Sequence, residues 1–165
     1  MSFSFVVVCE APDDFAIASR LIDRSIQEHG PDWVRHETSG ERWMRFDAVR
    51  AVQDTDAEVL LVPLHGHTRG HCAVAVKTAN RWLLHGGDAY FHRDEIRTRD
   101  PHCPVGMAMF QKFMAMDEPA RVANQARLRA LVLEQGPAVR VFCAHDAVDF
   151  ARCVAESESV ASPKV

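Results

Sequence analysis

Apolar residues in this chain fall into short runs separated by longer amphipathic stretches. Runs rich in β-branched or aromatic residues are typical of buried strands. They predict strands at residues 3–9, 58–63, 72–76, 82–84 and 139–143. Residues 32–45 and 90–104 are polar, contain glycine or proline, and predict loops.

Apolar positions that recur every three or four residues predict helices between these strands. One helix is expected over residues 12–30, and another begins near Asp117, which is an N-cap residue type, and ends at Gly136. Shorter helices are expected at 107–114 and 150–154, followed by a frayed tail. The alternation of strands and helices predicts an α+β (mixed α/β) fold.

The composition of the chain argues against several classes of protein. The chain has 165 residues, which suits one domain, and a net charge of −4 gives no general attraction to nucleic acid or to an anionic membrane. No apolar run approaches the ~20 residues of a membrane span. Five scattered cysteines without a C-x-x-C pair are typical of reduced thiols. Together these features predict a soluble cytoplasmic protein.

Candidate chemistry lies where three predicted strands begin or end. His71 closes the turn GHTRGH, Asp88 follows a Gly-Gly pair, and His145 follows the strand VRVFC. Side chains at strand ends meet on one rim of a sheet, and two imidazoles with a carboxylate suit zinc with an open position for water. A zinc-bound water has a pKa near ~7, so these residues predict a hydrolytic metal site.

The segments LLVPLHGHTRGHCAVAV, RWLLHGGDA and VFCAHD together resemble the later half of a metallo-β-lactamase-fold metallo-hydrolase. The resemblance implies one or two zinc ions held by His71, Asp88 and His145. It also implies that Asp88 bridges the metals or acts as the catalytic base, and that His67 orients the turn. His65 and Asp146 are expected to support the ligands without binding the metal.

The fold implied by this resemblance is half of an αββα sandwich, a mainly antiparallel or mixed sheet with helices on one face. It covers residues 41–158, preceded by a segment of other affiliation (1–40) and followed by a tail (159–165). The family's H-x-H-x-D-H motif is absent, because the only H-x-H is His65–Gly66–His67. We therefore expect a truncated chain with an incomplete site.

Three functions follow as hypotheses. The first is zinc-dependent hydrolysis of an ester, lactone, thioester or amide in a small-molecule substrate. The second is a non-catalytic interaction module that forms a homo-oligomer through an exposed sheet face. The third is a toprim-like, magnesium-dependent nucleic-acid enzyme using Glu10 and Asp14. The methionine-rich run 106–116 is interpreted as adaptable core filling rather than as a wall of a substrate pocket.

Overall fold

The computed structural model describes residues 40–52 and 55–161. The strand predicted at 3–9, the helix predicted at 12–30 and the toprim-like residues Glu10 and Asp14 lie outside these ranges. So does most of the predicted N-terminal segment 1–40.

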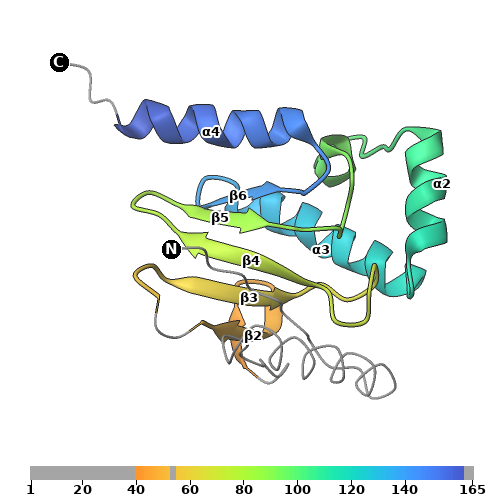
Figure 1. Cartoon of the computed structure of the whole chain (residues 1–165), viewed down its shortest axis with the longest axis horizontal. Coiled ribbons are helices and arrows are strands. Elements are labelled where there is room, and N and C mark those ends of the chain that lie inside the picture. Colours follow the sequence, from red (N-terminus) through yellow and green to blue (C-terminus); the bar gives the residue numbers. More distant parts are fainter. Residues whose placement is uncertain (1–39, 53–54, 162–165) are drawn as a thin grey trace, which may run out of the picture.

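The described part of the chain is built on one sheet whose six strands follow the order of the sequence, β1-β2-β3-β4-β5-β6 (Figure 1). Neighbouring strands pair antiparallel except β5 and β6, which are parallel. The strands are β1 (Glu41–Trp43), β2 (Phe46–Ala51), β3 (Val59–Pro63), β4 (Cys72–Lys77), β5 (Trp82–His85) and β6 (Val139–Phe142). The helices are η1 (Arg93–Ile96, 3-10), α2 (Val105–Met114), α3 (Glu118–Gln135) and α4 (Ala147–Ala161).

The main core lies between one face of the sheet and α3. Side chains alternate between the two faces of a strand, so every second residue of β3 to β6 reaches this core. Leu128 and Leu131 of α3 are fully buried against it. The strand residues in the same cluster are Leu60, Val62, Ala73, Ala75, Trp82, Leu84, Val139 and Val141.

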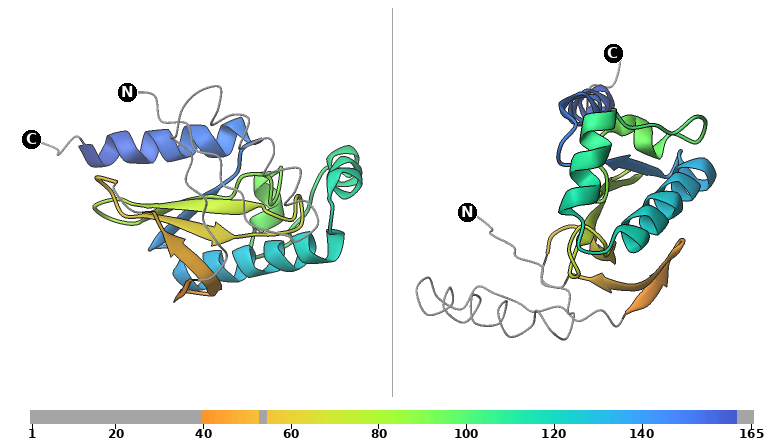
Figure 2. Two further views of the ribbon diagram at one scale, coloured as in Figure 1. Left: turned by 60° about the horizontal axis from the view of Figure 1, so that its bottom comes forward. Right: turned by 90° about the vertical axis from the view of Figure 1, so that its right-hand side faces the viewer.

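Helix α4 lies on the opposite face of the sheet from α3 (Figure 2). Arg140 and Phe142 alternate with the core residues of β6, and they meet α4 instead of α3. The ring centroids of Phe142 and Phe150 are 6.4 Å apart, and Arg140 pairs with Asp149 at 3.5 Å. The mixed α/β fold is thus as predicted, but helices flank both faces of the sheet rather than one.

Strands β3 to β6 and helix α3 confirm the elements that hydrophobic periodicity predicted. Asp117 is the N-cap of α3, since its side chain accepts a hydrogen bond of 2.9 Å from the Ala120 N–H. Helix α4 is longer than predicted, because it runs to Ala161. The predicted loop 90–104 contains the short helix η1.

Strands β1 and β2 were not predicted. The prediction of a loop over residues 32–45 is wrong at Glu41–Trp43, which form β1. The buried residues of β2, Phe46 and Val49, are three positions apart instead of two. Ala48 has a φ of 58°, and the β1–β2 register shifts between Glu41 and Trp43. A bulge of this kind breaks the period-2 pattern by which strands are recognised in a sequence.

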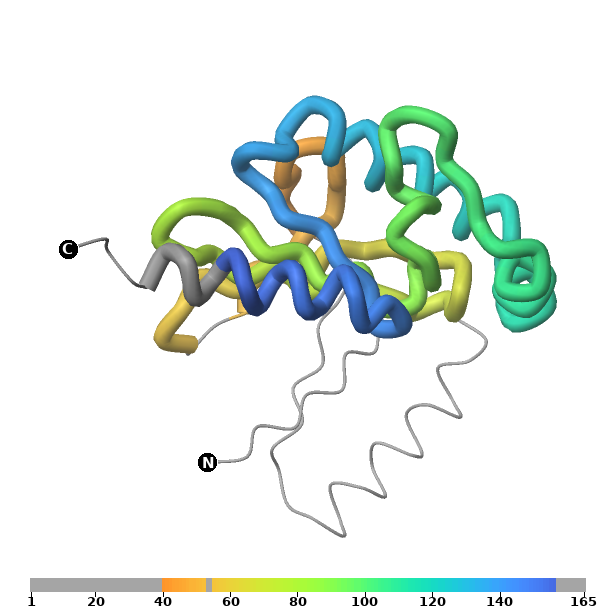
Figure 3. Tube along the Cα trace, turned by 90° about the horizontal axis from the view of Figure 1, so that it is seen from above, coloured from red at the N-terminus to blue at the C-terminus, as the bar shows by residue number. Residues whose placement is uncertain are grey.

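Helix α2 does not fill the core, so the interpretation of the methionine-rich run as core packing is wrong. Only Gln111 of this helix is buried. The apolar side chains that remain exposed on or beside it are Val105, Met109, Phe110, Phe113, Met114 and Met116. Seen from above, α2 lies at one end of the molecule, and the C-terminal end of α4 points to the other (Figure 3).

The cysteines differ in part from the expectation. Cys103, Cys143 and Cys153 are free thiols, and burial raises the pKa of Cys143 to about 11. Cys72 takes part in a disulfide bond, so the prediction of reduced thiols throughout the chain is wrong. Within the described ranges, no helix has both the length and the apolar character that crossing a membrane requires.

Leu84 and Leu83 provide a matched test of the two faces of the sheet. Leu84 is fully buried against α3, whereas Leu83 is half-buried on the other face. Leu84→Ala should lower the free energy of unfolding by about 2–5 kcal/mol through lost burial and a residual cavity. Leu83→Ala should cost clearly less, measured by urea denaturation; equal costs would contradict the placement of the core.

Candidate metal centre

The sheet topology brings three loops together at one edge. Strands β5 and β6 are parallel, so the residues that follow them, including Asp88 and His145, leave the sheet on the same side. Strand β4 is antiparallel to β5, so the β3–β4 loop that carries His67 and His71 reaches the same edge. Residues far apart in the sequence therefore meet here.

The carboxylate of Asp88 lies between two imidazoles. Its Oδ1 is 2.8 Å from Nε2 of His145, and its Oδ2 is 3.5 Å from Nε2 of His67. The His67 side chain is largely buried, whereas that of His145 is half exposed. Each oxygen of the carboxylate thus faces a different histidine.

Both ring nitrogens of His71 form hydrogen bonds with backbone groups. Nδ1 lies 2.9 Å from the Leu64 carbonyl oxygen, and Nε2 accepts a 2.9 Å hydrogen bond from the N–H of Asp88. Because a carbonyl only accepts and an amide only donates, these partners select the neutral ring with its proton on Nδ1. Burial lowers the pKa of His71 below its usual value, which also favours the neutral form.

Gly87 allows this close approach of His71 to Asp88. Its φ is 55°, in the left-handed region, and a Cβ at this position would lie 2.7 Å from Nε2 of His71. Gly86, the preceding residue, packs next to Tyr90, which a Cβ would meet at 3.2 Å. Side chains larger than glycine would therefore crowd their neighbours at both positions of the Gly-Gly pair.

The turn that carries His67 is docked on the beginning of α3. The carbonyls of Gly66 and His67 accept hydrogen bonds from the N–H groups of Asp117 (2.9 Å) and Met116 (3.1 Å). A Cβ on Gly66 would lie 2.4 Å from the backbone nitrogen of Arg121. This contact sets the direction in which His67 faces.

Asp146 anchors the loop that carries His145. Its carboxylate accepts hydrogen bonds from the N–H groups of Val148 and Asp149, both at 3.1 Å, at the beginning of α4. Its other oxygen accepts from the N–H of Arg93 at 2.9 Å. Burial alone would raise its pKa, but these hydrogen bonds and the Arg93 guanidinium hold the pKa of Asp146 below its usual value.

Two further histidines, His65 and His85, lie near the site and make contacts with other groups. The carbonyl of His65 accepts a 2.7 Å hydrogen bond from Asn124 of α3. The ring of His85 lies 5.0 Å from that of Phe142, and burial lowers its pKa even though Asp88 acts to raise it. His65 thus supports the turn through its backbone.

Sequence reasoning missed two residues of this site because both lie in the stretch predicted to be a featureless loop. Phe91 is buried against the imidazoles of His145 and His67, with ring centroids 4.3 and 5.9 Å away. Arg93 binds Asp146. Their positions three and five residues after Asp88 were the only signal in the sequence.

The residue types at this site are ones that bind zinc. The side chains of Asp88 and His145 are hydrogen-bonded to each other. Two imidazoles and a carboxylate are common zinc ligands. Among the described residues, however, no group of three or more histidine, cysteine, aspartate or glutamate side chains has an arrangement ready to hold a metal ion. Coordination would require the hydrogen bond between Asp88 and His145 to open.

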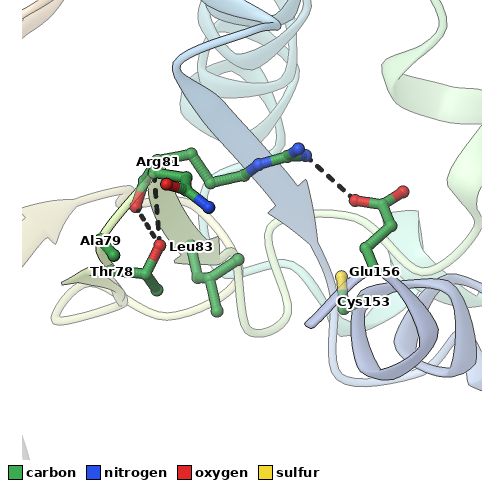
Figure 4. Close-up of a pocket in the computed structure, with 7 residues that line it drawn as sticks. Thr78, Ala79, Arg81, Leu83, Cys153 and Glu156 are labelled. Atoms are coloured by element: carbon green, nitrogen blue, oxygen red, sulfur yellow. Dashed lines mark hydrogen bonds and ion pairs between the residues drawn. The ribbon is translucent and has the colours of Figure 1, made fainter. Parts of the chain in front are cut away.

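A shallow cavity of about 150 Å³ lies at the opposite end of the strands from this site. It is bounded by the β4–β5 turn and by Cys153 and Glu156 of α4 (Figure 4). Arg81 spans it through a 3.0 Å ion pair with Glu156. It therefore has no part in the geometry around Asp88.

Comparison with known proteins gives relatives for this chain, although no family model matches it. Two curated proteins, probable metallo-hydrolases of Mycobacterium bovis and Mycobacterium tuberculosis, are each 39% identical to it over 118 residues. The aligned part is 72% of this chain and 38% of each relative. The chain thus spans less than half the length of these relatives.

Solved structures agree on the fold. An N-acyl homoserine lactone hydrolase with N-hexanoyl-L-homoserine bound superposes with a TM-score of 0.54, covering 91% of this chain and 50% of that one, at 16% identity. A quorum-quenching N-acyl homoserine lactone lactonase gives 0.53, with 92% and 53% coverage and 17% identity. The chain belongs to the same family of metallo-hydrolases as the two mycobacterial relatives, and its fold is of the metallo-β-lactamase type. In this metallo-hydrolase relative, the GHTRGH turn and the GGDA segment form the rim of the sheet at which Asp88 meets His67 and His145.

Gly87→Ala should destabilise the fold around this rim. The left-handed backbone alone costs about 1–2 kcal/mol for a residue with a Cβ, and the methyl group would also displace the His71 ring. Gly106→Ala is the matched control, because a Cβ there meets nothing within 4 Å. Urea denaturation should show a loss for Gly87→Ala and little change or a slight gain for Gly106→Ala. Equal unfolding free energies would contradict the close approach.

Proposed function

We propose that this chain supplies the ligands of a zinc-dependent hydrolase that cleaves an ester, lactone, thioester or amide in a small-molecule substrate. One observation carries the proposal: the Asp88 carboxylate contacts both His67, at 3.5 Å, and His145, at 2.8 Å. The three residues come from three separate loops. Such convergence of metal-ligand residue types at a sheet edge is typical of a catalytic site.

The contacts favour His67 rather than His71 as the second imidazole ligand. Both nitrogens of His71 are within hydrogen-bond distance of backbone groups, which leaves the ring no lone pair for a metal. Nε2 of His67 faces the same carboxylate as His145 does. We therefore assign the ligands as His67, Asp88 and His145, and give His71 the role of positioning Asp88 through its N–H.

Each residue has a defined part in hydrolysis. A bound zinc would supply a Lewis acid and a water whose pKa is lowered toward ~7. Asp88 has two carboxylate oxygens, so one can bind the metal while the other accepts a proton from an attacking water. His71 holds the Asp88 backbone while this happens. Asp146 and Arg93 keep the loop of His145 at the rim.

Glutamine substitutions separate the two assignments of the imidazole ligand. Glutamine offers one donor and one acceptor, as neutral His71 does, so His71→Gln should retain most of the zinc affinity. His67→Gln and His145→Gln should lose it. His102→Gln, at an exposed histidine beside Asp94, is the control. Zinc content and affinity are measured by elemental analysis and chelator competition.

If His71→Gln abolishes zinc binding while His67→Gln preserves it, His71 is the ligand and our assignment is wrong. If the unaltered chain binds no zinc above the level of the triple variant lacking all three ligands, the metal site itself is refuted. Hydrolysis is then tested on ester, lactone, thioester and amide substrates with the zinc-loaded chain and the His145→Gln variant.

A second candidate function is a homo-oligomeric interaction module. It is favoured by the exposed apolar side chains of α2, including Phe113, which is 85% exposed. Exposed apolar patches of this kind mark interfaces. Phe113→Ser should shift the chain toward a monomer in light scattering, whereas Lys112→Ser, on the same helix, should not. A monodisperse monomer of the unaltered chain at micromolar concentration would contradict this candidate.

A further inference from the structure

Phe91 touches both of the proposed imidazole ligands. Its ring centroid is 4.3 Å from that of His145 and 5.9 Å from that of His67, and its side chain is buried. On another side it meets Phe110 of α2 at 6.1 Å. Phe91 has no polar side-chain atom, so it can neither bind a metal nor compete with the imidazoles for the Asp88 carboxylate.

A buried carboxylate holds the backbone of Phe91. Oε1 of Glu95 accepts hydrogen bonds from the N–H groups of Phe91 and His92, both at 2.9 Å. Glu95 is 6% exposed and also accepts from Gln111 of α2 at 3.0 Å and from Gln125 of α3 at 3.1 Å. Several donors on three elements therefore converge on this one side chain.

The same network reaches the residue beside Asp88. Gln125 donates to the Ala89 carbonyl at 3.1 Å, and Arg121 of α3 donates to Gln111 at 3.1 Å. Buried polar groups with satisfied hydrogen bonds rigidify their surroundings. The loop from Ala89 to Glu95 is thus fixed at both ends by α2 and α3, and Phe91 lies in its middle.

An imidazole turns readily about its Cβ–Cγ bond, because that torsion has broad minima. The side chain of His145 is half exposed, so packing on its buried side must select the ring orientation that points Nε2 at Asp88. The ring of Phe91 lies on that side at contact distance. Ligands held in orientation before binding give a metal site higher affinity than ligands that must be ordered by the ion.

We propose that Phe91 is a positioning residue that fixes the ring orientations of His145 and His67, and that Glu95 fixes Phe91 through its backbone N–H. The function of this arrangement rests on the metal site proposed above. Phe91 acts through the two histidines and touches neither metal nor substrate in this role.

Phe91→Leu removes the ring and keeps an apolar side chain, whereas Phe91→Tyr keeps the ring. Phe142→Leu is the matched control, because it removes another ring that packs against a histidine, His85, with centroids 5.0 Å apart. Phe91→Met, which fills a similar volume flexibly, replaces the leucine variant if that variant does not fold. All variants are made in the full chain.

The first readout needs no metal. With the two rings 4.3 Å apart, the ring current of Phe91 should displace the ring-proton resonances of His145 in the NMR spectrum of the metal-free chain. We expect that displacement to be lost in Phe91→Leu and kept in Phe91→Tyr and Phe142→Leu. Unchanged His145 resonances in Phe91→Leu would overturn the proposal, whether or not the chain binds zinc.

The second readout is zinc affinity by chelator competition, with the unfolding midpoint measured alongside. Phe91→Leu should lower the affinity by about 10–100-fold, the range seen when groups that orient metal ligands are removed. Phe91→Tyr should restore it, and Phe142→Leu should leave it unchanged despite a comparable loss of stability. Equal affinity in all variants, or an equal loss in Phe142→Leu, would overturn the positioning role. Absence of zinc binding by the unaltered chain refutes the metal site, and the NMR result then decides the role of Phe91 alone.

Discussion

The hydrogen bond from the Asp88 N–H to Nε2 of His71 joins the β3–β4 loop to the end of β5, and the arrangement of the site depends on it. It forms only because Gly87 has no Cβ and a φ of 55°. With the backbone of Asp88 held in this way, its carboxylate faces His67 and His145. His71, which the sequence predicts as a metal ligand, thus also contributes its ring to the framework that holds this carboxylate.

Around this contact the structure has two layers of support. The sheet packs its apolar face on Leu128 and Leu131 of α3, and the same helix begins where the turn of His67 is docked. The buried carboxylate of Glu95 then ties α2, α3 and the loop after Asp88 together. Because α3 contributes to the core, the turn and the Glu95 network at once, the stability of the fold and the geometry of the site are coupled.

Much of the fold could be predicted from local pattern. Short apolar runs predicted β3 to β6, because the buried residues of these strands recur at every second position or closer and few of their residues are polar. Strand β2 could not be recognised, because the bulge at Ala48 separates its buried residues by three positions. The exposure of α2 could not be predicted either, since an amphipathic pattern does not say whether a partner surface lies beside the helix.

The sequence by itself determined the superfamily motifs, the residue types of a zinc site, and the expectation that Asp88 and His145 meet at one edge of a sheet. That expectation follows from the strand ends alone. The sequence assigned the imidazole ligand beside Asp88 and His145 to His71, whereas our proposal assigns it to His67; the two histidines share one turn and differ in the direction of their side chains. The sequence did not single out Phe91 or Glu95. Those assignments depend on how the turn docks on α3 and how the loop after Asp88 folds back, and only long-range contacts set these two conformations.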